Sequence, residues 1–269
     1  MSTLAELRDT RELFWNLTLR ELRTRYKRSA LGWAWSMLNP LATTLVYSFV
    51  FVVLFDAAPP TGNPSGLQVF GLFILCAILP WNYMAIGVGT SMGTVIANGS
   101  LVKKVAFPRE HLVLATVAAQ LVTLFIELGV LSVVMVFFGH IVLLQVPGVV
   151  VAAALLSMFV VGLSLMLSAG NVFFRDLNHL WNILLQIWFF LTPVVYSPDL
   201  VEAKVPGWLF WLYMHTPMAI AVQMFRVLLY DGRYPTIPQY GFMALWGGAT
   251  LWVGWSIFKR LAPRFPEEL

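Results

Sequence analysis

Long apolar segments separated by short polar ones make up most of this chain. Runs such as "LVYSFVFVVLF" and "VLSVVMVFF" do not alternate between polar and apolar positions, as the strands of a membrane β-barrel would. Uninterrupted apolar segments of about 20 residues are typical of membrane-spanning helices. The pattern predicts six spans, at roughly Leu31–Phe55, Leu67–Met92, His111–Phe138, Pro147–Val172, Asn178–Ser197 and Pro238–Phe258.

A seventh apolar segment, Gly207–Tyr230, is interrupted by polar residues and by Pro217. The positions of lysine and arginine decide whether it is a full span. With six spans, 14 of the 17 Lys and Arg residues lie on one side, which predicts that both termini are cytoplasmic. Gly207–Tyr230 is then a re-entrant pair of short helices within a region of about 199–232. Irregular backbone at membrane depth is tolerated where it is buried in protein or lines a polar cavity.

Composition supports an all-α polytopic membrane protein. The chain is 59% hydrophobic and 11% charged, whereas soluble domains are about 25% charged. The net charge of +4 does not indicate a nucleic-acid partner, because the basic residues lie at the ends of spans rather than along one soluble face. The single cysteine, Cys76, lies in an apolar run, so we expect neither a disulfide framework nor a cysteine-based metal site.

The arm of residues 1–30, which precedes the six-span domain 31–269, carries the densest positive charge. On a helix it has an apolar face and an opposite polar face, formed respectively by Trp15, Leu19, Leu22 and Tyr26 and by Asn16, Arg20, Arg23 and Lys27. This arrangement predicts an amphipathic helix at the cytoplasmic membrane interface. Two interpretations are compatible: a topology signal that binds anionic lipid, or a contact with a phosphorylated lipid head group.

Two features inside the predicted spans are of interest. Glu127 lies near the middle of the third span, and a carboxyl group at that depth usually faces protein or water. It either relays protons or has a structural role, which we favour because the six spans contain no clear Lys or Arg partner. Gly89 and Gly93 form a G-x-x-x-G pattern, which permits close helix packing.

Aromatic residues recur at helical spacing within two spans. Tyr47 and Phe51 are four residues apart in the first span, and Trp181 and Trp188 are seven apart in the fifth. They either belong to the interfacial aromatic belts or line a sugar pathway, since rings stack on the C–H face of sugars while hydroxyl groups bind their polar edges. The candidate channel residues are Tyr47, Phe51, Trp181, Trp188, Thr192 and Tyr196.

The sequence contains no catalytic or metal-binding constellation. Walker and H-E-x-x-H motifs are absent, and the four histidines are scattered over different segments. We therefore expect no enzyme activity and no cofactor in this chain. If the protein pumps a substrate, its motor is another chain.

Three patches together resemble one known family. They are "ELFWNLTLRELRTRYKRSALGWAWSMLNPL" (Glu12–Leu41), "FFRDLNHLWNILLQIWFFLTPVVYSP" (Phe173–Pro198) and "HTPMAIAVQMFRVLLYDG" (His215–Gly232). In order and spacing the sequence resembles the membrane subunits of ABC type 2 exporters for lipid-linked polysaccharides, such as O-antigen, teichoic acid, capsule and cell-wall galactan. His-Thr-Pro stands where that family usually has Asn-Pro. The resemblance covers nearly the whole chain but does not identify the glycan.

The resemblance implies a complex in the cytoplasmic membrane. Two copies of this permease would pair with two copies of a separate ATP-binding subunit, which binds ATP and Mg²⁺, and their first and fifth spans would line a channel. The re-entrant helices would form an outer gate that includes Pro217 and Arg226. The loop Asn98–Glu110 would couple to the ATPase through Ser100, Leu101, Lys103, Lys104 and Phe107.

The same resemblance gives the basic arm a role. Arg25, Lys27 and Arg28 would attract the head group of a polyprenyl-pyrophosphate-linked glycan. The Asn39-Pro40 step would loosen the helix just inside the membrane, because Pro40 lacks an N–H. Three alternatives stay open: an ABC type 2 permease for drugs or simple lipids, a proton-coupled carrier that depends on Glu127, and an intramembrane enzyme.

Overall fold

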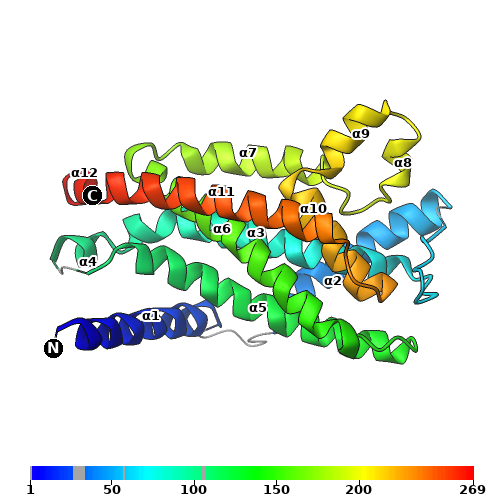
Figure 1. Cartoon of the computed structure of the whole chain (residues 1–269), viewed down its shortest axis with the longest axis horizontal. Helices are drawn as coiled ribbons and strands as arrows, with labels where there is room; N and C mark the ends of the chain where they lie inside the picture. The colour runs from blue at the N-terminus through cyan, green and yellow to red at the C-terminus, as the bar shows by residue number, and fades with distance from the viewer. Residues whose placement is uncertain (1, 27–33, 57, 105–106) are drawn as a thin grey trace.

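The computed structural model describes residues 2–26, 34–56, 58–104 and 107–269. Within these ranges the chain folds into helices joined by turns and loops, without a strand. Figure 1 shows a bundle of long helices that run back and forth along one axis. The predicted all-α class is therefore confirmed.

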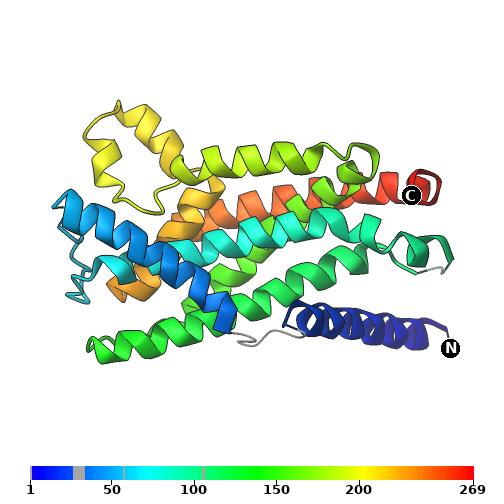
Figure 2. The same cartoon turned by 180° about the vertical axis from the view of Figure 1, so that it is seen from behind.

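Six helices form the body of the bundle, and Figures 1 and 2 show them side by side. They are α2 (Ala34–Ser48, continued by a π-helical segment, Phe49–Leu54), α3 (Phe70–Ala97), α5 (Glu110–Phe137), α6 (Val146–Phe173), α7 (Leu177–Phe190) and α11 (Ile237–Leu261). In the described ranges five helical segments are long and apolar enough to cross a membrane, and a bent helix pair raises the number to six. These five correspond to predicted spans one to four and six.

The fifth predicted span, Asn178–Ser197, is only partly helical. Helix α7 has 14 residues, a length of about 21 Å, which is shorter than the roughly 30 Å of hydrocarbon in a bilayer. It ends before Pro193, because proline has no N–H to donate and disfavours helical backbone at the preceding residue. The turns that follow keep Thr192 and Val194 fully buried. The last third of the span is thus irregular backbone, and its residues 192–195 are enclosed by protein.

The segment between α7 and α11 is bent back on itself. It contains α8 (Asp199–Glu202), α9 (Gly207–Met214) and α10 (Pro217–Arg226), which a π-helical segment extends to Asp231. The axes of Gly207–Met214 and Pro217–Asp231 differ by 77°. Figures 1 and 2 show that α7 arrives at, and α11 departs from, the same end of the bundle. The segment therefore enters and leaves at one end, as predicted for a re-entrant pair.

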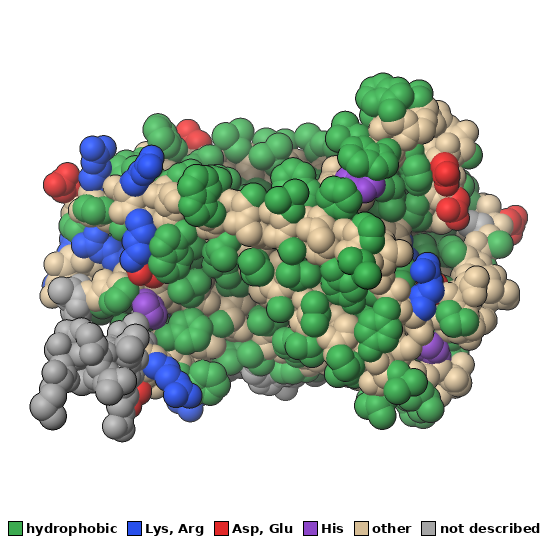
Figure 3. Space-filling model, in the orientation of Figure 1, with side chains coloured by type: hydrophobic (Ala, Val, Ile, Leu, Met, Phe, Trp, Pro, Cys, Tyr) green, Lys and Arg blue, Asp and Glu red, His purple; other side chains and the backbone are tan. Residues whose placement is uncertain are grey.

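Both chain termini lie at the opposite end of the bundle (Figure 1). This end also holds α1 (Ser2–Tyr26), α4 (Gly99–Lys104) and α12 (Phe265–Glu268). A buried apolar cluster joins these elements to α5, α6 and α11; we call it the terminal cluster, and it includes Leu17, Val102, Val172, Phe258 and Phe265. Figure 3 shows Lys and Arg side chains gathered at this end, with hydrophobic side chains over the middle of the molecule.

Helix α1 packs on α5 through a different face from the apolar face predicted. Leu13, Phe14 and Leu17 contact the terminal cluster, and the Phe14 ring meets the His111 ring edge-on at 6.2 Å between centroids. Trp15, which the sequence placed on the apolar face, is 59% exposed. The position of α1 at the membrane interface stays a prediction.

Helices α6 and α11 cross in close contact. A Cβ atom on Gly162 would overlap the backbone at Thr250 and Leu251, and one on Gly254 would overlap the backbone of Gly162. Glycine at both positions therefore lets the two backbones touch. Of the predicted pair Gly89 and Gly93, only Gly89 faces a neighbouring described side chain, that of Trp181 on α7.

Candidate functional site

An aromatic cluster lies between α2, α3 and α7. The rings of Tyr47 and Phe189 stack at 6.2 Å between centroids, and Trp81 meets Phe189 edge-on at 5.5 Å. Trp81 also meets Trp188 edge-on at 6.0 Å. The cluster consists of Tyr47, Phe51, Trp81, Trp181, Trp188 and Phe189.

The structure therefore brings together the predicted channel aromatics from the first and fifth spans. The sequence interpretation missed Trp81 and Phe189, which connect them. Trp81 follows Pro80 in an apolar run and carries no signal of its own. Phe189 is adjacent in sequence to the predicted Trp188, but only the fold shows that its ring points toward α2 and α3.

The predicted channel residues differ in how much surface they leave free in one protomer. Trp181 is 5% exposed and Thr192 is fully buried, whereas Tyr47, Phe51, Trp188 and Tyr196 are half-buried. The Thr192 hydroxyl donates to the Trp188 carbonyl at 2.9 Å. The Tyr196 hydroxyl donates to the Phe190 carbonyl at 2.8 Å and lies 2.9 Å from the Tyr213 hydroxyl.

Two helices of the bundle have largely uncovered faces. On α2, Leu45 is 70% and Val46 61% exposed. On α7 the exposed face carries Ile183 and Ile187 together with the polar residues Asn182 and Gln186. Asn182 and Gln186 are four residues apart and so share a face. Polar side chains on a span usually face protein or water, which distinguishes this face from an ordinary lipid-facing surface.

The predicted coupling loop forms α4 and its flanks, at the end that holds the termini. Ser100, Lys103 and Lys104 are exposed, whereas Leu101 and Phe107 pack against the terminal cluster. The five predicted residues thus divide into three that are free to meet a partner and two that hold the loop in place.

Polar contacts tie this end together. Arg20 of α1 donates to the Asn98 side-chain oxygen at 3.0 Å. Arg109 donates to the carbonyl oxygen of Ala262, and Lys259 of α11 forms an ion pair with Glu110 of α5. The coupling loop is therefore connected both to the N-terminal helix and to the last span.

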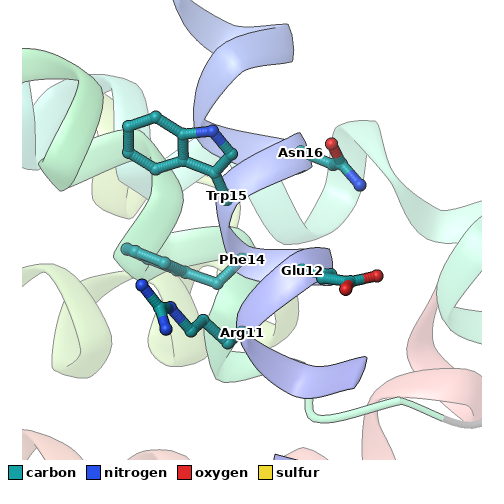
Figure 4. Close-up of a pocket in the computed structure, with 5 residues that line it drawn as sticks. All are labelled: Arg11, Glu12, Phe14, Trp15 and Asn16. Atoms are coloured by element: carbon teal, nitrogen blue, oxygen red, sulfur yellow. The ribbon is translucent and has the colours of Figure 1, made fainter. Parts of the chain in front are cut away.

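A cavity of about 850 Å³ opens beside α1. Figure 4 shows Arg11, Phe14 and Trp15 pointing to one side of the helix, and Glu12 and Asn16 to the other. Of the predicted head-group residues, Lys27 and Arg28 lie outside the described residues, and so does the side chain of Arg25. Their role stays a prediction.

The predicted gate residue Arg226 is buried at the far end of the bundle, with 4% of its surface exposed. Its guanidinium Nη2 donates to the Val194 carbonyl at 2.8 Å, and its Cζ lies 3.8 Å from the centre of the Phe73 ring. The Nε and Nη1 groups have no hydrogen-bond partner among the described residues. Pro217, the other predicted gate residue, occupies the first position of α10, where its missing N–H costs nothing.

These features define a polytopic helical membrane protein with a bent helix pair at one end and the helices of both termini at the other. The chain belongs to the ABC-2 type transporter family, whose sequence profile matches residues 12–230. This confirms the resemblance drawn from the three sequence patches and the expectation of a transport permease rather than an enzyme. Membership in this family also implies a separate ABC ATP-binding partner.

Individual relatives agree along nearly their full lengths. The chain is 30% identical over 269 residues to the O-antigen export system permease protein RfbA of Myxococcus xanthus, covering 98% of each chain. It is 29% identical over 255 residues to RfbA of Klebsiella pneumoniae, covering 94% of this chain and 93% of that one. It is 20% identical over 244 residues to the polysialic acid transport protein KpsM of Escherichia coli, covering 90% of this chain and 91% of that one.

Proposed function

We propose that this chain is the transmembrane subunit of an ABC transporter that exports a lipid-linked polysaccharide across the cytoplasmic membrane. The observation that carries the proposal is the end-to-end similarity to O-antigen export permeases, at 98% coverage of both chains for the Myxococcus xanthus protein. The aromatic cluster between α2, α3 and α7 supports it, since a glycan chain slides over rings that hold it weakly.

The working unit contains two permease chains and two ATP-binding subunits. The uncovered faces of α2 and α7 meet the second copy, and the conduit lies between the copies. Tyr47, Phe51, Trp188 and Tyr196 offer partly exposed surface to this space, while Trp181 and Thr192 support them from behind. The polar side chains of Asn182 and Gln186 then face a hydrated path rather than lipid.

Both termini are cytoplasmic in this proposal. The exposed residues Ser100, Lys103 and Lys104 of the α4 loop contact the ATP-binding subunit. The arm residues Arg25, Lys27 and Arg28 meet the pyrophosphate of the lipid carrier, since charged groups of that kind bind arginine and lysine strongly. At the outer end, the re-entrant segment with Pro217 and Arg226 gates the exit.

Complementation of a deletion strain tests the proposal. A strain that lacks this gene but retains its ATP-binding partner should lose its surface polysaccharide and accumulate the lipid-linked glycan inside, and the wild-type chain should restore export. Restored small-molecule efflux with unchanged surface glycan would instead favour a permease for drugs or simple lipids.

Aromatic substitutions distinguish these two substrates further. The triple change Tyr47→Ala, Phe51→Ala and Trp188→Ala should lower glycan export by about tenfold or more, since a stacking contact contributes roughly 1–3 kcal/mol. Trp252→Ala is a matched control, because Trp252 lies on α11 and is 74% exposed. Equal effects of the triple change and the control on glycan export would contradict a sugar conduit at the aromatic cluster.

A further inference from the structure

An open groove of about 740 Å³ lies on the face formed by α5, α6 and α11. Helix α6 packs against both of the other two helices and forms the floor between them. The groove is separate from the aromatic cluster, which lies between α2, α3 and α7. The side chains that line the groove include Leu114 and Leu121 on α5, Met158 and Val161 on α6, and Leu251 and Trp255 on α11.

The exposed lining of the groove is apolar. The hydroxyl of Ser157, a polar side chain in this lining, donates to the Ala153 carbonyl at 2.6 Å and lies 2.8 Å from the Tyr83 hydroxyl. Along α11 the groove extends from Trp255 to Gly248, seven residues away, which is about 10 Å along the helix axis. This length is about a third of the hydrocarbon thickness of a bilayer. The groove therefore suits one segment of an acyl chain.

Cations lie at the end of the groove that is nearer the chain termini. The Lys259 ammonium is 5.2 Å from the centre of the Trp255 ring, and its ion pair with Glu110 joins α11 to α5 at this end. An ammonium group has three N–H donors, and the Lys259 side chain is 48% exposed, so donors remain for an anion. Arg109 and Arg260 are the sequence neighbours of the ion pair, which gives these four residues three cations to one carboxylate.

This combination indicates the chemistry of the ligand. Figure 3 shows Lys and Arg side chains gathered at the end of the bundle, where the spans reach a membrane surface, and apolar side chains over the middle. Basic sites between spans at a membrane surface bind anionic lipid head groups. A phospholipid with a net negative head group therefore complements both parts, since its chain fits the apolar groove and its phosphate fits the cationic end. A zwitterionic head group carries its own cation and gains less.

We propose that the groove between α5, α6 and α11 binds one acidic membrane phospholipid, with an acyl chain along α11 and the phosphate at Lys259. The lipid is a membrane component bound outside the conduit and is not the cargo. The inference therefore goes beyond the proposed function and does not depend on which substrate is exported. Because Glu110 ends the predicted coupling loop, the bound phosphate meets the ion pair that ties this loop to the last span.

Photolabelling of the full permease–ATPase complex in phosphatidylcholine nanodiscs tests the inference. The probes are phosphatidylglycerol and phosphatidylcholine that carry the same diazirine in one acyl chain. Phosphatidylglycerol should label the groove residues of α5 and α11 about fivefold more strongly, since one basic group near the membrane surface contributes about 1 kcal/mol. Lys259→Gln should remove this preference, and Lys259→Arg, which keeps the charge, should retain it. Arg175→Gln, an exposed cation between α6 and α7, should leave it unchanged.

A second variant tests the acyl-chain part of the site without changing a charge. Gly248→Val places a side chain in the groove, where no described atom lies within 4 Å of the Cβ position. It should abolish labelling inside the groove by both probes, because the chain no longer fits beside α11. Gly129→Val is the matched control, since its Cβ position on α5 is equally open and it is not among the described lining residues. It should leave the labelling unchanged.

Equal labelling by the two probes in the wild-type complex would overturn the inference, because any lipid then fills the groove. A preference for phosphatidylglycerol that survives Lys259→Gln, or groove labelling that survives Gly248→Val, would overturn it as well. No groove labelling in the assembled complex would show that protein covers this face. Stronger competition by a polyprenyl phosphate than by unlabelled phosphatidylglycerol would assign the groove to the lipid carrier instead. If Lys259→Gln does not assemble because Glu110 is left unpaired, the double variant Lys259→Gln/Glu110→Gln serves in its place.

Discussion

The guanidinium group of Arg226 donates a hydrogen bond to the carbonyl oxygen of Val194 at 2.8 Å. This contact fixes the re-entrant helix α10 to the turn that follows α7. Because the same guanidinium lies 3.8 Å above the Phe73 ring on α3, one buried cation joins three elements at the end of the bundle opposite the termini. A buried charge is costly, which is consistent with the proposed role of Arg226 in a gate.

Arg226→Met should leave the chain inserted and abundant, because methionine retains an unbranched side chain in the space. It should lower export by about tenfold, since the Val194 carbonyl then loses its hydrogen bond. The turn should also become accessible, which thiol labelling of Val194→Cys in a Cys76→Ala background measures. Arg233→Met is the control, because Arg233 is half-exposed in its 3.4 Å ion pair with Asp231 and such pairs contribute little. Wild-type export by Arg226→Met would exclude a role in gating.

The crossing of α6 and α11 depends on the absence of side chains at Gly162 and Gly254. Gly254→Val should destabilise the chain by about 1–3 kcal/mol or more, because the added atoms overlap the backbone of α6. Gly248→Val, in the same helix and with no described atom within 4 Å of its Cβ position, should have a much smaller effect. Thermal melting of the detergent-solubilised variants, followed by size-exclusion fluorescence, compares the two. Equal melting temperatures would contradict the close crossing.

Five of the six predicted spans were found as long apolar helices, because each is a continuous apolar segment. The positions of lysine and arginine favour a re-entrant pair over a seventh span, which stays a prediction. The end of α7 was also within reach of sequence reasoning, since Pro193 interrupts helical hydrogen bonding. The face of α1 that packs against α5 could not be predicted, because it depends on which α5 residues lie opposite Phe14 and Leu17.

Contacts between distant segments could not be predicted from local pattern. Gly162 and Gly254 meet across two helices, and nothing local distinguishes them from the other glycines. Tyr47 and Trp188 were predicted as channel residues from their helical spacing. Trp81, which connects their two helices, lies on a third helix, α3. Glu127 was interpreted as a single group because Asn39 and Asn82, its neighbours around a cavity between α2, α3 and α5, come from other helices.

The exposed lysines of α4 should matter for coupling rather than for folding. The double change Lys103→Glu/Lys104→Glu should lower glycan-stimulated ATP hydrolysis by the assembled complex by about tenfold, because like charge at an interface costs several kcal/mol. Lys204→Glu, at the opposite end of the helix bundle, should leave the rate of ATP hydrolysis unchanged. The ATPase activity of purified complexes provides the measurement. Equal activity of the two variants would show that the α4 lysines do not contribute to the contact with the ATP-binding subunit.

Leu101 and Phe107 should behave differently from these lysines, because both pack against the terminal cluster. Phe107→Ala should reduce thermal stability, whereas the lysine variants should not, since surface substitutions usually change stability by less than about 0.5 kcal/mol. Melting curves of the same purified complexes distinguish the two groups. A stable Phe107→Ala complex would show that the loop does not depend on this contact.

Both termini should be on the cytoplasmic side. A reporter that is active only in the cytoplasm should work when fused to either Met1 or Leu269, and a reporter that requires export should fail at both ends. The physical reason is the excess of lysine and arginine at the end that carries the termini. An exported reporter that is active at Leu269 would overturn the six-span arrangement.

Reconstituted transport tests the central claim most directly. Purified permease and its ATP-binding partner are placed in liposomes that contain the lipid-linked glycan, and the movement of the glycan across the bilayer is followed with a membrane-impermeant glycosidase. We predict translocation that requires ATP hydrolysis, persists when the proton gradient is collapsed and remains in Glu127→Gln. Translocation that follows the proton gradient without ATP, or a glycan that stays in place while ATP is hydrolysed and another substrate moves, would contradict the account.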